Sequence, residues 1–181
     1  AVDFVLAGGT GRYADDLEVI NRISRSCKRM ERLIDDLLDA SRLDSGAVIV
    51  APRATPAADL VQDALDAATL EATAGRVKVI AREVAPLRVM ADRDRVLQVF
   101  SNLVGNALKF TPADGTISLG VERVGDLARF TVADTGAGIP PEHLPKLFER
   151  FWKGERSGRH SAGLGLYIAR GIVLAHGGQI A

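Results

Sequence analysis

Asn102 and Asn106 are two carboxamide residues placed four positions apart in a segment whose apolar residues follow helical spacing. One face of a helix would therefore carry both side chains, with Lys109 on nearly the same side. Carboxamide oxygens are hard, neutral ligands that suit Mg2+, whose remaining positions take water and phosphate oxygens. The ammonium group of Lys109 can then meet phosphate charge. The alternative, two asparagines on a solvated face, is disfavoured because asparagine is a poor residue for a helix interior.

A second candidate segment begins with Asp134 at the end of an alternating strand and runs to Ile139. A carboxylate exposed there can accept a hydrogen bond from an exocyclic amine such as that of adenine. Gly136 and Gly138 allow the backbone to approach a flat ring because neither carries a Cβ atom. A plain Asp-x-Gly turn explains this segment equally well when it is taken alone.

A second glycine cluster comprises Gly163, Leu164, Gly165 and Leu166 and precedes an apolar helix. Free amide groups at a helix start suit phosphate, although a flexible loop before a helix is an equally good interpretation. The cluster matches neither a Walker motif, which needs Gly-Lys-Ser/Thr, nor a dinucleotide fingerprint, which needs a strand leading into it. Taken in order, the three segments predict a pocket for ATP and a divalent cation.

Aromatic residues followed by basic residues lie between the two glycine clusters. This pattern favours a lid that folds over a polyphosphate, with a solvated charge run as the alternative. The residues are Phe148, Phe151, Trp152, Lys153, Arg156, Arg159 and His160.

The composition excludes several classes of protein. The chain has 181 residues, 47% of them apolar, and its 23 basic and 23 acidic residues balance to a formal net charge of +0. It therefore carries no global charge for nucleic acid or an anionic membrane surface. Cys27 is the single cysteine, so an internal disulfide is excluded, and no apolar run reaches the roughly 18 residues of a membrane-spanning helix. The chain opens without methionine and ends at Ala181 as a new strand begins, so we expect a fragment.

The first part of the chain, up to Gly46, shows the heptad spacing of one long helix with an apolar seam. Asp15 or Asp16 can cap its start and Gly46 can end it, while Gly8-Gly9-Thr10-Gly11 could turn the chain from a preceding helix. One such helix cannot bury its own seam, so it needs a partner, either a second helix or its own domain. The seam residues are Ile20, Ile23, Cys27, Met30, Ile34, Leu37 and Ser41.

The second part has the pattern of mixed α and β structure, with helices on one face of a sheet. Helices are expected at 57–73, 94–110, 142–148 and 164–175, and strands at 47–50, 77–84, 88–91, 116–124 and 127–133. Gly125 and Asp126 would form the turn between the last two strands, which is a hairpin signal.

These motifs resemble those of the C-terminal core of a bacterial sensor histidine kinase of two-component signalling, over nearly the whole chain from about Asp16. Residues 98–112 are similar to the N box of that family, and residues 32–46 to the second helix of its dimerisation hairpin. Its two glycine boxes and its aromatic box resemble residues 134–139, 161–166 and 148–152. Four ordered motifs make the resemblance specific.

The resemblance implies an α+β fold in two domains. Residues 1–46 would be a dimerisation helical hairpin, incomplete at its N-terminus, that pairs with a second copy into a four-helix bundle. Residues 47–181 would be the catalytic ATP-binding domain of the gyrase, chaperone, histidine kinase and mismatch-repair ATPase superfamily. This domain is an α/β sandwich with a mixed sheet and helices on one face, and its last strands would be missing.

The resemblance also implies roles for the matched residues. Asp134 would bind the adenine amine, Asn106 would hold Mg2+ with help from Asn102, and Lys109 would contact phosphate. The glycines would give backbone room and lid mobility. The matched positions in the two glycine boxes are Gly136, Gly138, Ile139, Gly163, Leu164, Gly165 and Leu166.

By the same resemblance, the chain would bind Mg-ATP in the cytoplasm and transfer the γ-phosphoryl group to a histidine, for relay to a response regulator aspartate. The parent protein could be membrane-anchored or soluble. None of His143, His160 and His176 lies in the helical region, so we expect nucleotide binding without autophosphorylation at the usual site. A degenerate kinase that binds nucleotide only as a regulatory module remains the alternative. Topoisomerase, mismatch-repair and chaperone ATPases are disfavoured because they carry an acidic residue where Asn102 stands.

Overall fold

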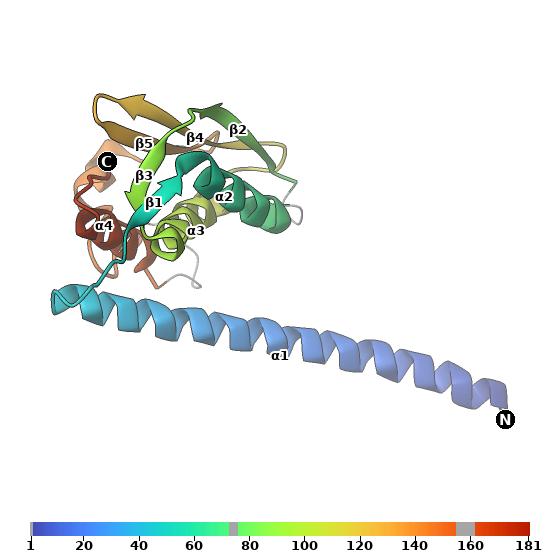
Figure 1. The fold of residues 1–181 in the computed structure, drawn as a ribbon. Helices are drawn as coiled ribbons and strands as arrows, with labels where there is room; N and C mark the ends of the chain where they lie inside the picture. The colour runs from blue at the N-terminus through green and yellow to red at the C-terminus, as the bar shows by residue number, and fades with distance from the viewer. Residues whose placement is uncertain (1, 73–75, 155–161) are drawn as a thin grey trace. The chain divides into compact units, whose positions relative to one another are not determined.

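The computed structural model describes residues 2–72, 76–154 and 162–181. The chain divides into two compact units, residues 1–38 and residues 39–181. The described part of the first unit is helical and belongs to α1, Val2–Asp44, whose final residues 39–44 are part of the second unit (Figure 1). Within the described residues, no helix is both long and apolar enough to cross a bilayer.

The continuity of α1 corrects one expectation from the sequence. A turn at Gly8-Gly9-Thr10-Gly11 and a helix start at Asp15 or Asp16 were wrong, because α1 runs through all of these positions. A glycine costs a helix interior only about 1 kcal/mol relative to alanine, so these three glycines do not by themselves break the helix.

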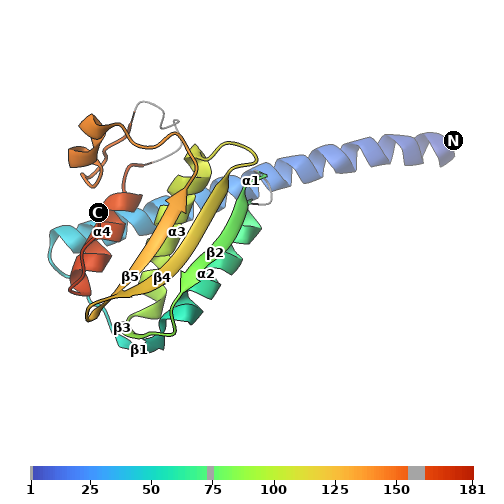
Figure 2. The ribbon, with the colours of Figure 1, turned by 90° about the horizontal axis from the view of Figure 1, so that it is seen from above.

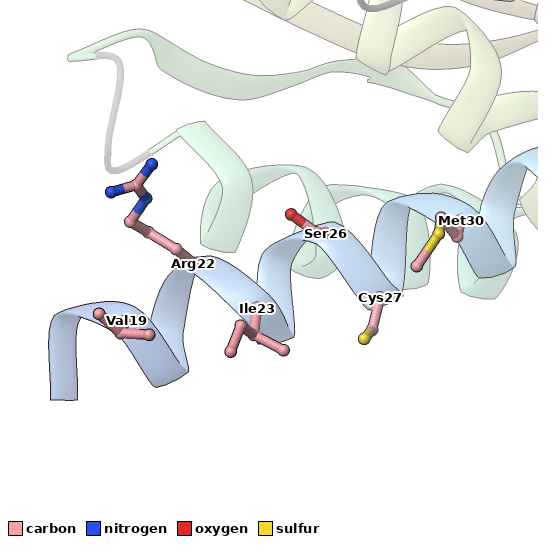
Figure 3. Close-up of a pocket in the computed structure, with 6 residues that line it drawn as sticks. All are labelled: Val19, Arg22, Ile23, Ser26, Cys27 and Met30. Carbon is pink, nitrogen blue, oxygen red and sulfur yellow. The ribbon is translucent and has the colours of Figure 1, made fainter. Parts of the chain in front are cut away.

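The apolar seam of α1 is exposed. Ile20 and Ile34 each keep more than half of their surface in solvent. Figure 3 shows Ile23 and Cys27 on one side of the helix and Ser26 on the other. The open depression along this stretch is lined by Val19, Arg22, Ile23, Ser26, Cys27 and Met30. In a single copy of the chain the seam is therefore a surface and not a core.

Two short strands form a separate sheet at the start of the second unit. β1, Arg53–Pro56, pairs antiparallel with β3, Arg88–Ala91, so that Arg53 lies opposite Ala91. The strand expected at 47–50 was wrong, because those residues lack regular structure and the strand follows at 53–56. Pro56 is tolerated because it ends a strand of a two-stranded sheet, where a missing amide donor costs little.

Among the described residues, the main sheet contains three strands in the order β2-β4-β5. β2, Lys78–Val84, runs parallel to β4, Thr116–Val124, and β4 runs antiparallel to β5, Leu127–Asp134. The sheet is therefore mixed, as expected. Val124 and Leu127 pair across the predicted two-residue turn, where Gly125 has a φ of 61°.

Helices α2, Ala57–Ala72, and α3, Arg93–Phe110, cover one face of this sheet (Figure 2). The core between these layers is apolar, and the rings of Phe100 and Phe130 meet edge to face at 5.7 Å. Its fully buried members include Leu60, Val61, Ile117, Leu119 and Val121. The α+β architecture and both helices agree with the expectation.

The last helix, α4, Gly165–Ala175, packs beside α3 around a second apolar cluster. Ile168 and Ala169 of α4 are buried there with Val99 of α3 and Ala40 of the last turns of α1. The short helix expected at 142–148 is a 3-10 helix, η2, Pro141–Lys146. Pro145 within it lacks an amide hydrogen, which is consistent with a short and irregular helix.

Candidate nucleotide-binding site

The start of α3 is fixed by the carboxylate of Asp92. Its Oδ1 accepts a hydrogen bond from the amide of Arg95 at 3.3 Å, which caps the helix, and its Oδ2 accepts one from the amide of Ala51 at 3.0 Å. The bond from Ala51 is the main reason that the pKa of Asp92 lies below its usual value, against an opposing effect of burial. The amide of Asp92 in turn donates to Nε2 of His176 at 3.0 Å. The beginning of α3 is therefore held against the end of α4.

Asn102 and Asn106 are both half-buried on α3. Nδ2 of Asn102 is a buried polar atom without a hydrogen-bond partner among the described residues. The backbone of Gly165 lies directly against this side chain, since a Cβ atom at Gly165 would sit 3.2 Å from Oδ1 of Asn102. The structure thus brings the first predicted segment into contact with the third. A buried amide without a partner is costly, so this position suits a ligand with hydrogen-bonding oxygens.

Lys109 lies at the last turn of α3, with its ammonium 4.8 Å from the ring centre of Phe110. Partial burial lowers the pKa of Lys109, and the positive charge of Lys153 lowers it further. Two cationic side chains therefore act on one another at this end of α3. A bound anion would relieve their repulsion, which is the electrostatic condition that a phosphate group needs.

Asp134 is the last residue of β5 and is exposed. Its Oδ1 accepts a hydrogen bond from the amide of Gly136 at 2.7 Å. A Cβ atom at Gly136 would lie 2.6 Å from this same oxygen and 2.7 Å from the carbonyl oxygen of Phe110. The segment is thus both an Asp-x-Gly turn and a close packing contact with the end of α3. A carboxylate has about four acceptor positions, so the exposed group keeps capacity for another donor.

The other residues of the first glycine segment differ from Gly136 in their surroundings. Gly138 has a φ of 70° and no atom near a Cβ position, so backbone conformation and not crowding favours glycine there. Ile139 is about half exposed, at 48%. It offers an apolar side chain beside the turn.

The second glycine cluster leads into α4. Gly163 has a φ of 71°, and its carbonyl accepts a hydrogen bond from the amide of Phe151 at 2.9 Å. Leu164 is buried at the N-cap position, where no side chain caps the helix, and α4 begins at Gly165. Leu166 is half-buried. The N-cap residue Leu164 offers the first amides of α4 no side-chain acceptor, so this helix start is suited to an anion.

The described histidines make structural contacts and form no metal site with other residues of the described chain. His143 meets the ring of Trp152 edge to face at 5.3 Å, and His176 accepts from Asp92, so both have structural contacts. His160, Arg156 and Arg159 lie outside the described residues, so the lid prediction rests largely on positions that the structure does not describe. Within the described part of the chain, no group of three or more His, Cys, Asp or Glu residues could hold a metal. The carboxamides of Asn102 and Asn106 remain the candidate protein ligands for Mg2+.

Sequence reasoning missed a polar cluster behind α3. Asp39 is only 8% exposed, and Nη1 of Arg95 and Nε2 of Gln98 donate to its carboxylate at 3.0 Å and 2.6 Å. Gln98 lies one helical turn before Asn102. Asp39 falls on the polar face of the heptad pattern, where a solvated charge is the ordinary interpretation, so the sequence carried no signal for it.

Comparison with known proteins identifies the class to which this fold and site belong. Residues 91–181 match the family of histidine kinase-, DNA gyrase B-, and HSP90-like ATPases, and the chain belongs to that family. Its relatives and structural neighbours in that family are sensor histidine kinases, whose catalytic domains it resembles.

Two curated relatives are bacterial histidine kinases. The chain is 35% identical over 169 residues to the circadian input-output histidine kinase CikA of Synechococcus elongatus, covering 90% of this chain and 22% of the relative. It is 31% identical to the signal transduction histidine-protein kinase BaeS of Escherichia coli, covering 90% of this chain and 36% of the relative. The chain therefore spans well under half of the length of these proteins.

Two solved structures share the fold. Full-length ShkA in complex with AMPPNP has a TM-score of 0.70 and 29% sequence identity, with 80% of this chain and 30% of that chain covered. The histidine kinase AdeS of Acinetobacter baumannii has a TM-score of 0.66 at 23% identity, with 80% and 66% covered, and supports the fold alone.

Proposed function

We propose that this chain binds Mg-ATP and is the phosphotransferase core of a protein-histidine kinase. The observation that carries the proposal is the contact between Asn102 and Gly165. There a buried amide on α3, which has no partner among the described residues, meets a helix start whose N-cap residue makes no side-chain hydrogen bond within that part of the chain. Phosphate oxygens are the ligand class that satisfies both features.

Each part of ATP has a candidate partner. Asp134 binds the exocyclic amine of adenine, and Lys109 meets phosphate charge. Asn106 holds Mg2+, and Asn102 assists on the metal or phosphate side. When bound, Mg2+ neutralises the charge on the phosphate oxygens. The residues of this chain bind and orient the nucleotide, which is most of what phosphoryl transfer requires of a protein.

The γ-phosphoryl group would pass from ATP to a histidine imidazole, with ADP as the leaving group, and then to an aspartate of a response regulator. No histidine occurs within residues 1–46, so we propose an acceptor outside these residues. The same observation favours a second candidate, a nucleotide-binding regulatory module without autophosphorylation. In either case we propose a cytoplasmic homodimer formed through α1.

Calorimetry with Mg-ATP tests nucleotide binding. We expect Mg-dependent binding by the wild-type chain and its loss, by tenfold or more, in Asn106→Ala. The control is Gln62→Ala, which removes a carboxamide that bonds Asp66 on the same helix, α2, and should leave affinity unchanged. Near-wild-type affinity in Asn106→Ala would contradict the metal role.

A transfer assay separates the two candidate functions. The chain would be mixed with labelled ATP and a helical hairpin that carries an acceptor histidine. Label on the hairpin supports the kinase. Tight ATP binding without any label supports the regulatory module.

A further inference from the structure

The carboxylate of Asp44 joins two residues that flank the second glycine cluster in the sequence. Asp44 is the last residue of α1, and its Oδ2 accepts a hydrogen bond from Nη1 of Arg150 at 2.5 Å. Its Oδ1 accepts one from the hydroxyl of Tyr167 at 2.6 Å. Arg150 precedes Gly163 in the chain, and Tyr167 follows Leu166. The side chain of Asp44 therefore contacts one residue on each side of the second glycine cluster.

The contact between Asp44 and Arg150 is linked to Gly163 through a single residue, Phe151. The guanidinium of Arg150 lies 4.6 Å from the ring centre of Phe151, and the amide of Phe151 donates to the carbonyl of Gly163. Phe151 has a φ of 63°, which is unusual for a residue with a side chain. Such a backbone persists only where surrounding contacts hold it. The ion pair between Arg150 and Asp44 is one of these contacts.

The contact between Asp44 and Tyr167 is linked to Asn102 through the first turn of α4. Tyr167 is two residues from Gly165, whose backbone lies against Asn102. The hydrogen bond to the charged Asp44 is the main reason that the pKa of Tyr167 is raised, and burial adds to it. Leu43 packs where a Cβ atom at Gly171 would stand, so the last turn of α1 also fits closely against α4.

We propose that Asp44 is a positioning residue for the phosphate end of the nucleotide site, an inference that rests on the proposed function. Its carboxylate holds Arg150 and Tyr167, so that Gly163 keeps its bond to Phe151 and Gly165 keeps its place beside Asn102. Asp134, the candidate adenine ligand, lies on β5 outside this network. Loss of Asp44 should therefore weaken binding of the phosphates and leave binding of the base unchanged.

Comparing ligands with and without phosphates tests this proposal. In Asp44→Ala we expect the Kd of Mg-ATP to rise three- to tenfold and the Kd of adenosine to stay at the wild-type value. The matched control is Asp63→Ala, which removes another carboxylate of a short ion pair, 2.7 Å from Arg93, between α2 and α3. That control should change neither affinity.

Two further variants distinguish loss of the positioning contacts from a general folding defect. Tyr167→Phe removes only a hydroxyl group and should raise the Kd of Mg-ATP two- to fivefold, while Asp44→Glu should restore part of the affinity lost in Asp44→Ala. Unchanged Mg-ATP affinity in Asp44→Ala and Tyr167→Phe would overturn the proposal, as would equal losses for adenosine and ATP. If Asp134→Ala weakens binding and Asp44→Ala does not, only the positioning role fails. No binding by the wild-type chain would overturn both proposals.

Discussion

At the scale of single residues, the first glycine segment contains two glycines that are required for different physical reasons. Gly136 is crowded by a side-chain oxygen of Asp134 and a backbone oxygen of Phe110, whereas Gly138 is open but has a positive φ. A glycine required by crowding is sensitive to any added atom. A glycine required by conformation is sensitive to the backbone penalty of an L side chain.

Gly136→Ala should lower the free energy of unfolding by about 1–3 kcal/mol, the usual cost of inserting a methyl group into a filled space. The nearest backbone atom, the carbonyl oxygen of Phe110, belongs to the end of α3 and cannot move alone. Gly105→Ala is the control, because it lies within α3 with nothing near its Cβ position and should stabilise the helix by up to about 1 kcal/mol. Urea unfolding of both variants measures the two changes. A free energy of unfolding of Gly136→Ala equal to that of the wild type would show that the crowding is relieved without cost.

Lys109 illustrates a residue whose binding role opposes stability. Its pKa lies below the ordinary value of 10.5, so the penalty for carrying its charge is present at neutral pH and disappears only above pH 10.5. Lys109→Met should therefore leave the melting temperature of the nucleotide-free protein equal or higher, while it weakens Mg-ATP binding. Lys146→Met on η2 makes the same charge change and should affect neither quantity. A lower melting temperature together with unchanged ATP affinity would contradict the assignment.

At the scale of elements, the sequence predicted those parts in which local pattern and global fold agree. The apolar periodicity of α3 and the alternation of β4 placed these elements within a residue of their observed bounds. β1 was missed because its position depends on pairing with β3, which is more than 30 residues away. The turn predicted at Gly8-Gly9-Thr10-Gly11 was wrong because glycines weaken a helix without necessarily ending it.

The candidate site likewise divides into residues that a local pattern identifies and contacts that depend on long-range packing. Asn102, Asn106, Asp134 and the glycines were identifiable because each group has a characteristic residue type at short spacing. The contact between Asn102 and Gly165 depends on packing of α4 against α3, which no local pattern shows. Asp44 was invisible for the same reason, since its partners lie over 100 residues away.

The N-cap of α3 carries a prediction about the whole element. Asp92→Ala removes the cap and the acceptor for Ala51, so the free energy of unfolding should fall by about 1–2 kcal/mol at pH 7. The pKa of Asp92 is depressed in the fold, so its contribution is complete above the ordinary value of 3.8 and is lost as the pH falls through the folded-state pKa. Urea unfolding at pH 7 and at about pH 2.5 should show the wild-type advantage shrinking at low pH.

Asp94→Ala is the matched control for that variant. Asp94 lies in the first turn of α3 with a side chain that is 93% exposed, so its removal should cost a few tenths of a kcal/mol at most. A loss as large as that of Asp92→Ala would mean that net charge at the helix start matters and that the bonds from Arg95 and Ala51 do not.

At the scale of the whole molecule, one long helix leaves an apolar seam that the described chain does not cover. Ile23 and Met30 lie seven residues apart in the seam, and each is more than half exposed. The formal net charge of +0 gives two copies no strong reason to repel. Burial of such side chains stabilises by about 1.5–3 kcal/mol each. Association of two copies through this seam would supply that burial, as the proposed homodimer requires.

Ile23→Glu should therefore weaken self-association strongly, because two copies would each bring an unpaired carboxylate into an apolar interface. Sedimentation over a range of concentrations should show a dimer for the wild-type chain and a monomer for the variant at the same concentration. Asn21→Glu makes the same charge change outside the seam, two residues before Ile23, and should remain a dimer. If Asn21→Glu dissociates as readily as Ile23→Glu, repulsion between helices and not burial of the seam controls assembly. If the wild-type chain is a monomer throughout, the seam takes a different partner, and both variants should then leave the mass unchanged.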